Sequence, residues 1–246
     1  MKLGLNTYFK NIGYEREEIR INCYNINMIN SVIFDMDGLL FDTEIIYFTC
    51  YKKAAAEWGL NFTFELFSTC IGISREEAEK FMKQHFGTAV DPAKLHSRTY
   101  EVVEEYLQNG GEIPFRPGAK EAVEFFHKRG LKIGLASSNM RKWAEFYLRK
   151  KDILNYFSVI TTCEEVSQLK PNPEVYLKTA QKLETPAAQC LVFEDSAPGA
   201  TAAITAGMRT CMVPQISKPT RFIRERAFKI YNSLHDIYPD MDELLA

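Results

Sequence analysis

The sequence lacks any apolar run that approaches the roughly 18 residues of a membrane-spanning helix. Its first residues also lack the basic and then apolar pattern of a secretion signal, and the chain has no internal repeat or low-complexity tract. These absences argue against membrane-spanning, secreted and repeat proteins. We therefore expect a cytoplasmic protein with no membrane partner.

An excess of charge of either sign is missing as well. The 246 residues carry 30 Lys and Arg against 32 Asp and Glu, which gives a formal net charge of −2. A chain so close to neutral has no general field that would hold nucleic acid or an anionic surface. We expect no nucleic-acid partner, and local groups must hold any anionic ligand.

Cysteine pairs with the spacing of a metal or redox site are also absent. The six cysteines are scattered, and several lie inside apolar runs such as Cys190–Phe193, as reduced core residues of a cytoplasmic protein do. The four histidines are isolated on helical patterns, so no zinc site is predicted. Residues 1–29 are rich in Asn and Ile without a convincing period, and we expect a poorly structured N-terminal extension there.

What the sequence does contain is a series of short apolar segments separated by helical patterns, with 46% hydrophobic residues to fill a core. Strands and helices that alternate along the chain favour parallel pairing through right-handed crossovers. The pattern predicts an α/β fold with a doubly wound, Rossmann-like parallel sheet. The expected strands are 32–34, 132–136, 157–161, 190–193 and 209–213, and the helices between the last four are 143–150, 173–183 and 199–206.

A longer stretch, residues 43–114, separates the first two strands and has helical periodicity throughout. One face of its first helix is expected to hold Phe48, Tyr51, Ala55 and Trp58. Glycines and prolines between residues 110 and 118 mark the return of the chain to the sheet. We expect an all-helical cap domain at 43–114, inserted into a core domain made of 30–42 and 115–246.

Polar residues follow three of the predicted strands directly. Because the carboxyl ends of parallel strands meet at one edge of a sheet, we expect these side chains to form one cluster there. The residues concerned are Asp35 and Asp37 after the first strand, Ser137, Ser138 and Asn139 after the second, and Glu194 and Asp195 after the fourth.

Four carboxylates at one edge require a cation or shifted pKa values. Mg²⁺ fits the need, since it binds carboxylate and carbonyl oxygens and accepts phosphate oxygens in its remaining positions. Lys170 supplies a second positive charge, because Pro171 and Pro173 restrict the backbone directly after it. The residues thus indicate a Mg²⁺ site that handles phosphate.

These residues resemble the four motifs of the haloacid dehalogenase superfamily, in its branch with a small helical cap. The first motif matches Asp35–Gly38, the second Ser137, the third Lys170 before a proline, and the fourth Glu194-Asp195 with Gly199 downstream. The resemblance covers about residues 30–240.

The resemblance implies a role for each site residue. Asp35 would be the nucleophile that forms an aspartyl-phosphate, and Asp37 the general acid that protonates the leaving oxygen and then activates water. Ser137, Ser138 and Asn139 would hold the phosphate, with Lys170 as the catalytic cation. Mg²⁺ would be held by Asp35, Asp37 through its carbonyl, Glu194 and Asp195.

The resemblance also addresses the choice of reaction. Dehalogenases of the family lack a carboxylate at the position of Asp37, which favours phosphate ester chemistry. Two neighbouring residues, Thr43 and Glu44, match phosphatases of small metabolites and are expected to contact substrate. Arg75 resembles the phosphate-binding arginine in the cap loop of β-phosphoglucomutases, and we expect it to bind substrate.

Other positions depart from the mutase pattern. Tyr47 stands where the mutase has a histidine, and Ile71 and Met140 stand where it has lysines. We predict a Mg²⁺-dependent phosphatase of a small phosphorylated metabolite, such as a sugar phosphate. The alternatives are a β-phosphoglucomutase-type mutase and a non-catalytic binding protein of the same fold. A monomer is favoured, although the sequence leaves the oligomeric state open.

Overall fold

A six-stranded parallel sheet forms the centre of the protein, with the strand order β3-β2-β1-β4-β5-β6. The structure is a computed structural model that describes residues 28–71 and 75–246. The order reverses at β1, because β2 and β3 lie on one side of it and β4 to β6 on the other. The strands are β1 (Ser31–Phe34), β2 (Lys132–Ala136), β3 (Val159–Thr161), β4 (Cys190–Glu194), β5 (Arg209–Met212) and β6 (Lys229–Ile230).

The central strands are buried on both faces, which explains why they are apolar without alternation. In β1, Val32 and Phe34 point into one hydrophobic core, and Ile33 points into the other. The Phe34 ring stacks on that of Phe193 in the neighbouring β4, with centroids 5.5 Å apart. Helix-covered faces on both sides therefore hold the end of β1 in a fixed position.

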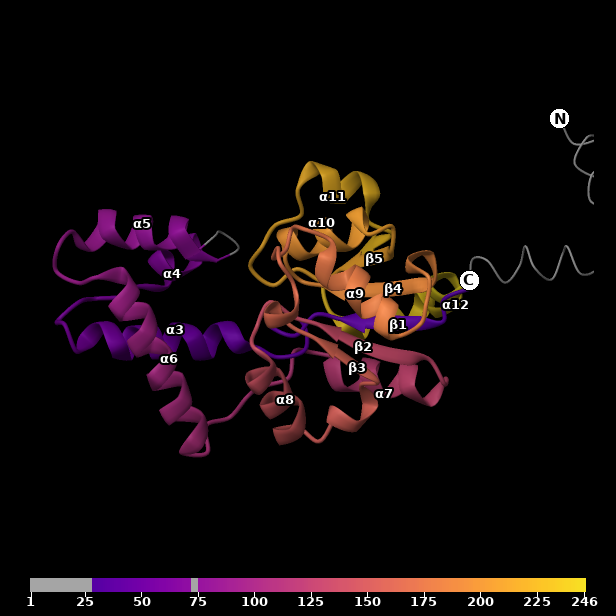
Figure 1. Ribbon diagram of the computed structural model, residues 1–246, viewed down its shortest axis with the longest axis horizontal. Helices are drawn as coiled ribbons and strands as arrows, with labels where there is room; N and C mark the ends of the chain where they lie inside the picture. Colours follow the sequence, from indigo (N-terminus) through magenta and orange to yellow (C-terminus); the bar gives the residue numbers. More distant parts are fainter. Residues whose placement is uncertain (1–27, 72–74) are drawn as a thin grey trace, which may run out of the picture.

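Helices cover the two faces as a doubly wound fold requires (Figure 1). One face packs against α9 (Glu174–Lys182) and α10 (Ala197–Thr205), and the other against α7 (Ala119–Lys128) and α8 (Arg141–Lys150). Two short helices, α11 (Arg221–Arg226) and α12 (Met241–Leu245), lie near the end of the chain. The predicted fold class is confirmed.

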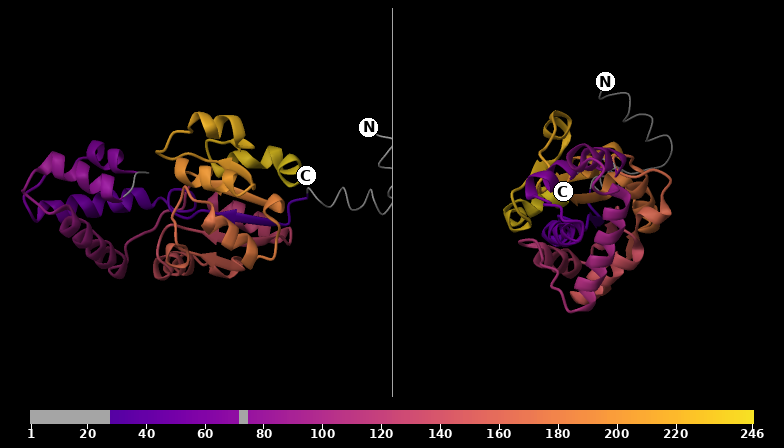
Figure 2. Two further views of the ribbon diagram at one scale, coloured as in Figure 1. Left: turned by 45° about the horizontal axis from the view of Figure 1, so that its top comes forward. Right: turned by 90° about the vertical axis from the view of Figure 1, so that its left-hand side faces the viewer.

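Between β1 and α7 the chain forms a layer of four helices that lies beyond the edge of the sheet (Figure 2). They are α3 (Thr43–Ala56), α4 (Phe64–Cys70), α5 (Arg75–Phe86) and α6 (Pro92–Gln108). Tyr51 of α3 stacks on Phe62 with ring centroids 5.0 Å apart, inside a small core that also buries Leu95 of α6. The insert is helical, as predicted, and its independence as a domain over 43–114 stays a prediction.

The two connections of the insert run side by side. The Asp42 N–H donates to the Pro114 carbonyl, and the Arg116 N–H donates to the Leu40 carbonyl, both at 2.9 Å. The segment that enters the insert at Asp42 and the segment that leaves it before Arg116 are thus hydrogen-bonded neighbours. Any motion of the insert relative to the sheet must pass through this pair of segments.

Three details differ from the sequence prediction or fall outside it. Trp58 lies beyond the end of α3 and is 39% exposed, so its assignment to the buried face of that helix was wrong. The short strand β6 was not predicted, because two residues carry no periodic signal. The expected N-terminal extension lies, up to residue 27, outside the described part of the chain. Among the described helices, none has the length and apolar character needed to cross a membrane.

Candidate active site

The polar residues that follow β1, β2 and β4 come together at one edge of the sheet. The Asp35 N–H donates to the Phe193 carbonyl at 3.1 Å, and the Ser137 N–H donates to the Thr161 carbonyl at 3.0 Å. These bonds continue the strand ladders by one residue, so both side chains start from rigid backbone. The predicted cluster therefore forms.

A buried lysine lies at the centre of the cluster. The Lys170 ammonium donates to Asp35 Oδ1 at 2.5 Å, to Glu194 Oε1 at 2.7 Å and to the Ala136 carbonyl at 3.0 Å. Its side chain is only 6% exposed. Burial alone would lower the pKa of Lys170, but the Asp35 and Glu194 carboxylates raise that pKa above its ordinary range. The lysine is therefore charged.

Two carboxylates of the cluster, Asp35 and Asp195, have raised pKa values. Burial raises the pKa of Asp35 to about 8, against the attraction of Lys170 and together with the repulsion from Glu194 and Asp37. Burial also raises the pKa of Asp195, and the negative charges of Glu194 and Asp35 add to the effect. One lysine therefore does not offset the negative charge gathered at this edge.

Asp37 lies at the turn that follows β1 and lines the same opening as the other carboxylates. Gly38 has φ of +83°, and its N–H donates to the Phe41 carbonyl at 2.9 Å, which closes the turn. Asp37 Oδ2 accepts a bond from Asn139 Nδ2 at 3.2 Å, and Oδ1 is buried with no hydrogen-bond partner among the described residues. Burial raises the pKa of Asp37, with Thr43 and Asn139 opposing the rise.

Two glycines are required by close approach to the acidic residues. A Cβ on Gly38 would lie 2.3 Å from Asp195 Oδ2, and a Cβ on Gly199 would lie 1.6 Å from Glu194 Oε1. Neither distance is compatible with a side chain at these positions. The glycine downstream of Glu194 and Asp195 therefore leaves room for the Glu194 carboxylate.

The cluster fits a divalent cation. Asp35, Glu194 and Asp195 each offer a carboxylate oxygen, these oxygens lie within 4.8 Å of one another, and all three residues are buried. A second sign is an orphaned acceptor beside them, since Gln215 Oε1 is buried without a hydrogen-bond partner in the described structure. Excess negative charge and an unpaired amide oxygen are features that a hard cation with bound water would satisfy.

Glu194 differs from the other two acids in its hydrogen bonds. Its Oε1 accepts from Lys170 and from the Tyr176 hydroxyl, and its Oε2 accepts from the Ser196 N–H and hydroxyl, at 2.7 to 3.0 Å. Four donors fill the acceptor sites of a carboxylate. Asp35 and Asp195 are therefore better placed to give oxygens to a cation than Glu194 is.

The predicted substrate residues differ in how far they are buried. Thr43 is buried at the start of α3, Glu44 is partly buried beside the acidic cluster, and Ser138 is exposed at the same opening. The side chain of Arg75 lies outside the described part of the chain. The structure therefore brings together every predicted site residue except Arg75, whose side chain it does not describe.

Sequence reasoning missed Gln215 and Tyr176. Gln215 follows β5 at the same edge, and its Nε2 donates to Asp42 Oδ1 at 2.7 Å, which links the site to the connection of the insert. Tyr176 lies on α9, and its hydroxyl donates a hydrogen bond to Glu194 Oε1. The strand-end rule, applied to the fifth strand, could have found Gln215, whereas no signal in the sequence marks Tyr176.

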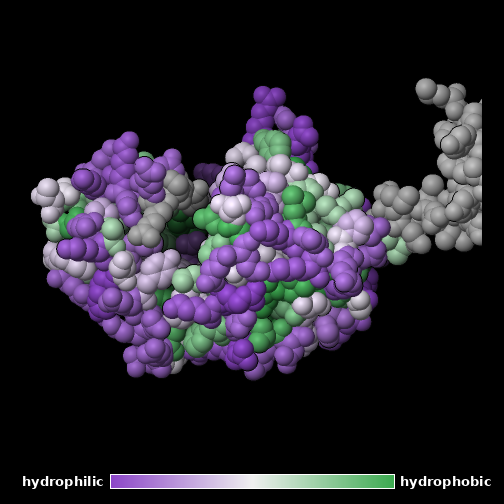
Figure 3. Space-filling view, viewed as in Figure 1, coloured by the Kyte–Doolittle hydropathy of each residue, from purple (hydrophilic) through white to green (hydrophobic). Residues whose placement is uncertain are grey.

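Beyond the acidic cluster a cleft of about 570 Å³ lies between the helical insert and the sheet. Asp37, Ser138 and Asn139 line its floor, and Tyr47 and Tyr100 line it from the insert. Figure 3 shows the molecule hollowed there, with hydrophobic side chains on the core side of the hollow. A molecule in this cleft would reach Asp37 directly.

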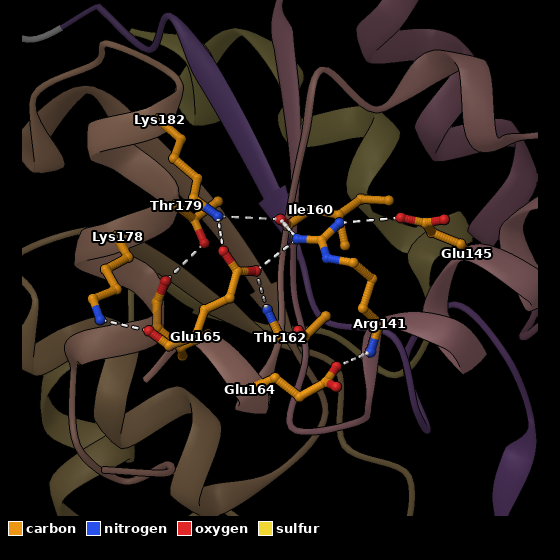
Figure 4. A network of polar contacts seen from close by, with 10 residues as sticks. Arg141, Glu145, Ile160, Thr162, Glu164, Glu165, Lys178, Thr179 and Lys182 are labelled. Atoms are coloured by element: carbon orange, nitrogen blue, oxygen red, sulfur yellow. Dashed lines mark hydrogen bonds and ion pairs between the residues drawn. The ribbon is translucent and has the colours of Figure 1, made fainter. Parts of the chain in front are cut away.

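A network of ion pairs supports the two loops that carry Asn139 and Lys170 (Figure 4). Glu165 accepts from Arg141 Nη2 at 2.6 Å and from the Lys182 ammonium, and its carbonyl accepts from Lys178. Arg141 begins α8 two residues after Asn139, and both lysines belong to α9. Glu165 thus ties together the elements on either side of the site.

Comparisons with known proteins agree with this geometry. The family model described as haloacid dehalogenase-like hydrolase matches residues 32–213. The chain is 31% identical over 212 residues to the phosphorylated carbohydrates phosphatase of Thermotoga maritima, covering 85% of this chain and 88% of that protein. It is 31% identical over 197 residues to hexitol phosphatase B of Escherichia coli K12, with coverage of 76% and 84%.

A solved structure has the same fold over most of the chain. A Thermotoga maritima protein provisionally assigned as a β-phosphoglucomutase superposes with a TM-score of 0.73 and 28% sequence identity, over 88% of this chain and 100% of that one. Because the family model matches most of the chain and a relative is 31% identical over 85% of it, the chain belongs to the haloacid dehalogenase-like hydrolases.

Proposed function

We propose that this protein is a Mg²⁺-dependent phosphatase that hydrolyses a small phosphorylated metabolite, a sugar phosphate, through an aspartyl-phosphate. The observation that carries the proposal is the separation of two carboxylates within one site. Asp35 is held by Lys170, while Asp37 lines the cleft and has a buried oxygen that is unpaired among the described residues. The names of the related phosphatases of phosphorylated carbohydrates and hexitols support the same class of substrate.

Asp35 is the nucleophile in this proposal. It lies at the end of a rigid strand, and Lys170 stabilises its ionised form. Attack on phosphorus forms the bond between Asp35 and the phosphoryl group while the bond to the leaving oxygen breaks. Ser137 and Asn139 hold phosphate oxygens, and the Lys170 ammonium reduces the repulsion between the two anions.

Asp37 moves the protons. Its raised pKa, caused by burial, lets it carry a proton for the leaving oxygen, and the resulting carboxylate then accepts a proton from the water that attacks the aspartyl-phosphate. Its bond with Asn139 couples its orientation to the phosphate-binding loop. Two acids in different surroundings thereby take two different roles.

Mg²⁺ would be held by Asp35, Asp195 and the Asp37 carbonyl, with Glu194 holding Lys170 beside them. When bound, it supplies charge neutralisation for the transferring phosphoryl group. The Asp35, Glu194 and Asp195 cluster supports this assignment.

Transfer to water rather than to a sugar hydroxyl is favoured by three side chains. Tyr47, Ile71 and Met140, which replace a histidine and two lysines of the mutase pattern, all line the cleft. A bisphosphate intermediate would find neutral groups at these positions. The cytoplasmic location and the monomeric state stay predictions of the sequence.

The test is phosphate release from a panel of phosphorylated metabolites with Mg²⁺, for the wild type and Asp35→Asn. We expect the wild type to release phosphate and the variant to lose activity by at least about a thousandfold. Equal release by both proteins, or by neither, would support a non-catalytic protein. Faster conversion of β-glucose 1-phosphate to the 6-phosphate than phosphate release would support the mutase.

A further inference from the structure

The loop that follows β5 holds a side chain that reaches both the acidic cluster and the connection of the insert. Gln215 lines the same opening as Asp35 and Asp195, and its Nε2 donates to Asp42 Oδ1 at 2.7 Å. Asp42 directly precedes α3, the first helix of the insert. The proposed reaction assigns no role to this bridge.

The loop is anchored on both sides of Gln215. The Val213 N–H donates to the Glu194 carbonyl at 2.7 Å, which extends the ladder between β4 and β5. Downstream, the Ala197 N–H at the start of α10 donates to Ser217 Oγ at 2.9 Å. Because both anchors are close to Gln215 in the chain, the backbone places its amide at a fixed point beside the cluster.

The Asp42 end of the bridge takes the place of a helix cap. Asp42 occupies the N-cap position of α3, where aspartate commonly accepts from the N–H groups of the helix, yet its side chain makes no such bond. Its Oδ1 accepts from Gln215 instead, and its N–H donates to the Pro114 carbonyl at 2.9 Å. The bridge therefore ends on the segment through which the insert joins the sheet.

The other end of the bridge is an oxygen without a donor. An ionised carboxylate only accepts, so the amide nitrogen of Gln215 must lie toward Asp42 and its oxygen away from it. That Oε1 is buried and has no hydrogen-bond partner among the described residues. It lies 2.9 Å from the position that a Cβ on Gly38 would take, and Asp195 Oδ2 lies 2.3 Å from the same position. A hydrated Mg²⁺ held by Asp195 would bring waters that donate to an oxygen at this point.

We propose that Gln215 is a positioning residue that couples the cation site to the entry of the insert. Its oxygen accepts from the water around the cation, and its nitrogen holds Asp42. The cation thereby orders the connection of the insert, and an ordered connection favours the cation, since linkage between two sites is reciprocal. The inference rests on the proposed Mg²⁺-dependent function and adds a residue that contacts neither the phosphoryl group nor the cation itself.

The first test measures the affinity for Mg²⁺ from the rise of the melting temperature with Mg²⁺ concentration. Gln215→Met removes both polar ends of the side chain and should weaken Mg²⁺ binding by at least about tenfold, as loss of an outer-shell partner of a metal does. Gln181→Met is the matched control, because Gln181 is exposed on α9, and it should bind Mg²⁺ as the wild type does. Wild-type affinity in Gln215→Met would overturn the proposal.

Two variants of Asp42 test the coupling from the insert. Asp42→Ala and Asp42→Asn remove the same negative charge, but only asparagine keeps an oxygen that can accept from Gln215. We expect Asp42→Ala to bind Mg²⁺ at least about threefold more weakly than Asp42→Asn, although Asp42 is not among the residues that line the opening of the cluster. Equal affinities would mean that Gln215 acts without the insert, against the proposal.

Amide hydrogen exchange measures the coupling without any assay of activity. Mg²⁺ should slow exchange of the Asp42 and Arg116 N–H groups in the wild type, because these groups bond the two connections together. Gln215→Glu keeps an oxygen beside the cluster but sets a second carboxylate against Asp42. It should bind Mg²⁺ at least as tightly as the wild type and lose this slowing, and a retained slowing would refute the coupling.

Phosphate release separates the inference from the proposed function. If the wild type hydrolyses phosphate esters and Gln215→Met binds Mg²⁺ with unchanged affinity, the inference fails and the phosphatase stands. If Mg²⁺ slows exchange in the wild type alone and no phosphate ester is hydrolysed, the coupling stands and the proposed function fails.

Discussion

The ammonium nitrogen of Lys170 lies 2.5 Å from Asp35 Oδ1, although 135 positions separate the two residues in the chain. The same nitrogen lies 2.7 Å from Glu194 Oε1, and the side chains of all three residues are less than a tenth exposed. The lysine therefore holds two buried carboxylates from two adjacent strands. Loss of this one cation would leave both acids in a dry environment without a counter-charge.

Lys170→Met should consequently destabilise the protein and abolish activity. We expect the free energy of unfolding to fall by roughly 3–5 kcal/mol, since removing one partner leaves a buried charge uncompensated. Lys120→Met is the control, because Lys120 pairs with Glu124 at 3.9 Å but is 49% exposed, and its loss should cost less than about 1 kcal/mol. Denaturant unfolding of both variants measures the difference, and similar losses would contradict the buried pairing.

Gly199→Ala provides a test in which two effects have opposite signs. Gly199 lies inside α10, where helix propensity alone would favour alanine by about 1 kcal/mol. The new Cβ, however, would lie 1.6 Å from Glu194 Oε1, so we expect a net loss of about 1–3 kcal/mol. Combining the change with Glu194→Ala should remove most of the penalty. A stabilised single variant in thermal unfolding would show that the contact is absent.

Asp195→Asn should show separately how the acidic cluster affects stability and whether it binds a divalent cation. Without divalent cation, the variant is expected to be more stable than the wild type by on the order of 1 kcal/mol, because burial and neighbouring acids disfavour the Asp195 carboxylate. Saturating Mg²⁺ should raise the melting temperature of the wild type and leave that of the variant unchanged. Asp242→Asn, on the exposed side of α12, is the control. An equal Mg²⁺ response in Asp195→Asn would place the cation elsewhere.

Glu44 predicts a dependence of stability on pH. Burial raises its pKa to about 7, and the negative charges of Asp37 and Asp42 add to the rise. The folded protein then binds this proton more tightly than the unfolded chain, so the contribution of Glu44 to stability falls as pH rises from about 4.5 through about 7. Glu44→Gln should therefore gain stability relative to the wild type between about pH 5 and about pH 8, measured with a chelator present. A constant difference across this range would refute the shift.

Glu165→Ala tests how the two loops that carry Asn139 and Lys170 are supported. Loss of the bonds to Arg141, Lys182 and the Thr162 N–H should lower the free energy of unfolding by about 1–2 kcal/mol. Glu145→Ala removes a single exposed partner of Arg141 and should cost less than about 0.5 kcal/mol. We also expect a lower kcat for Glu165→Ala, because the loops that carry Asn139 and Lys170 lose the ion pairs that connect them. Identical unfolding curves for the two variants would show that Glu165 contributes no more to stability than Glu145 does.

The fold was readable from the sequence because its strands are short apolar segments with both faces buried. Such segments need no partner to be recognised, and the helices between them fix parallel pairing. Trp58 and β6 show the limit of this reading. A helix end and a two-residue strand depend on tertiary packing, which periodicity does not record.

The site was readable for a related reason. Parallel register brings the ends of β1, β2 and β4 to one edge regardless of the distance between them in the chain, so Asp35, Ser137 and Asp195 had to meet. The same rule covers Gln215, which was missed only because the end of the fifth strand was not considered. No comparable rule predicts Tyr176, because it lies within helix α9 and its hydroxyl bonds Glu194 only in the folded protein.

The sequence by itself therefore determined which acids gather, because strand order follows from local patterns, and it predicted that positive charge accompanies them. Only the tertiary structure decided the surroundings of each of those acids. Asp37 lines both the acidic cluster and the cleft, and donors from Lys170, Tyr176 and Ser196 fill the acceptor sites of Glu194. Those surroundings depend on contacts a few ångströms long between residues far apart in the chain, and only the packed fold brings these residues into contact.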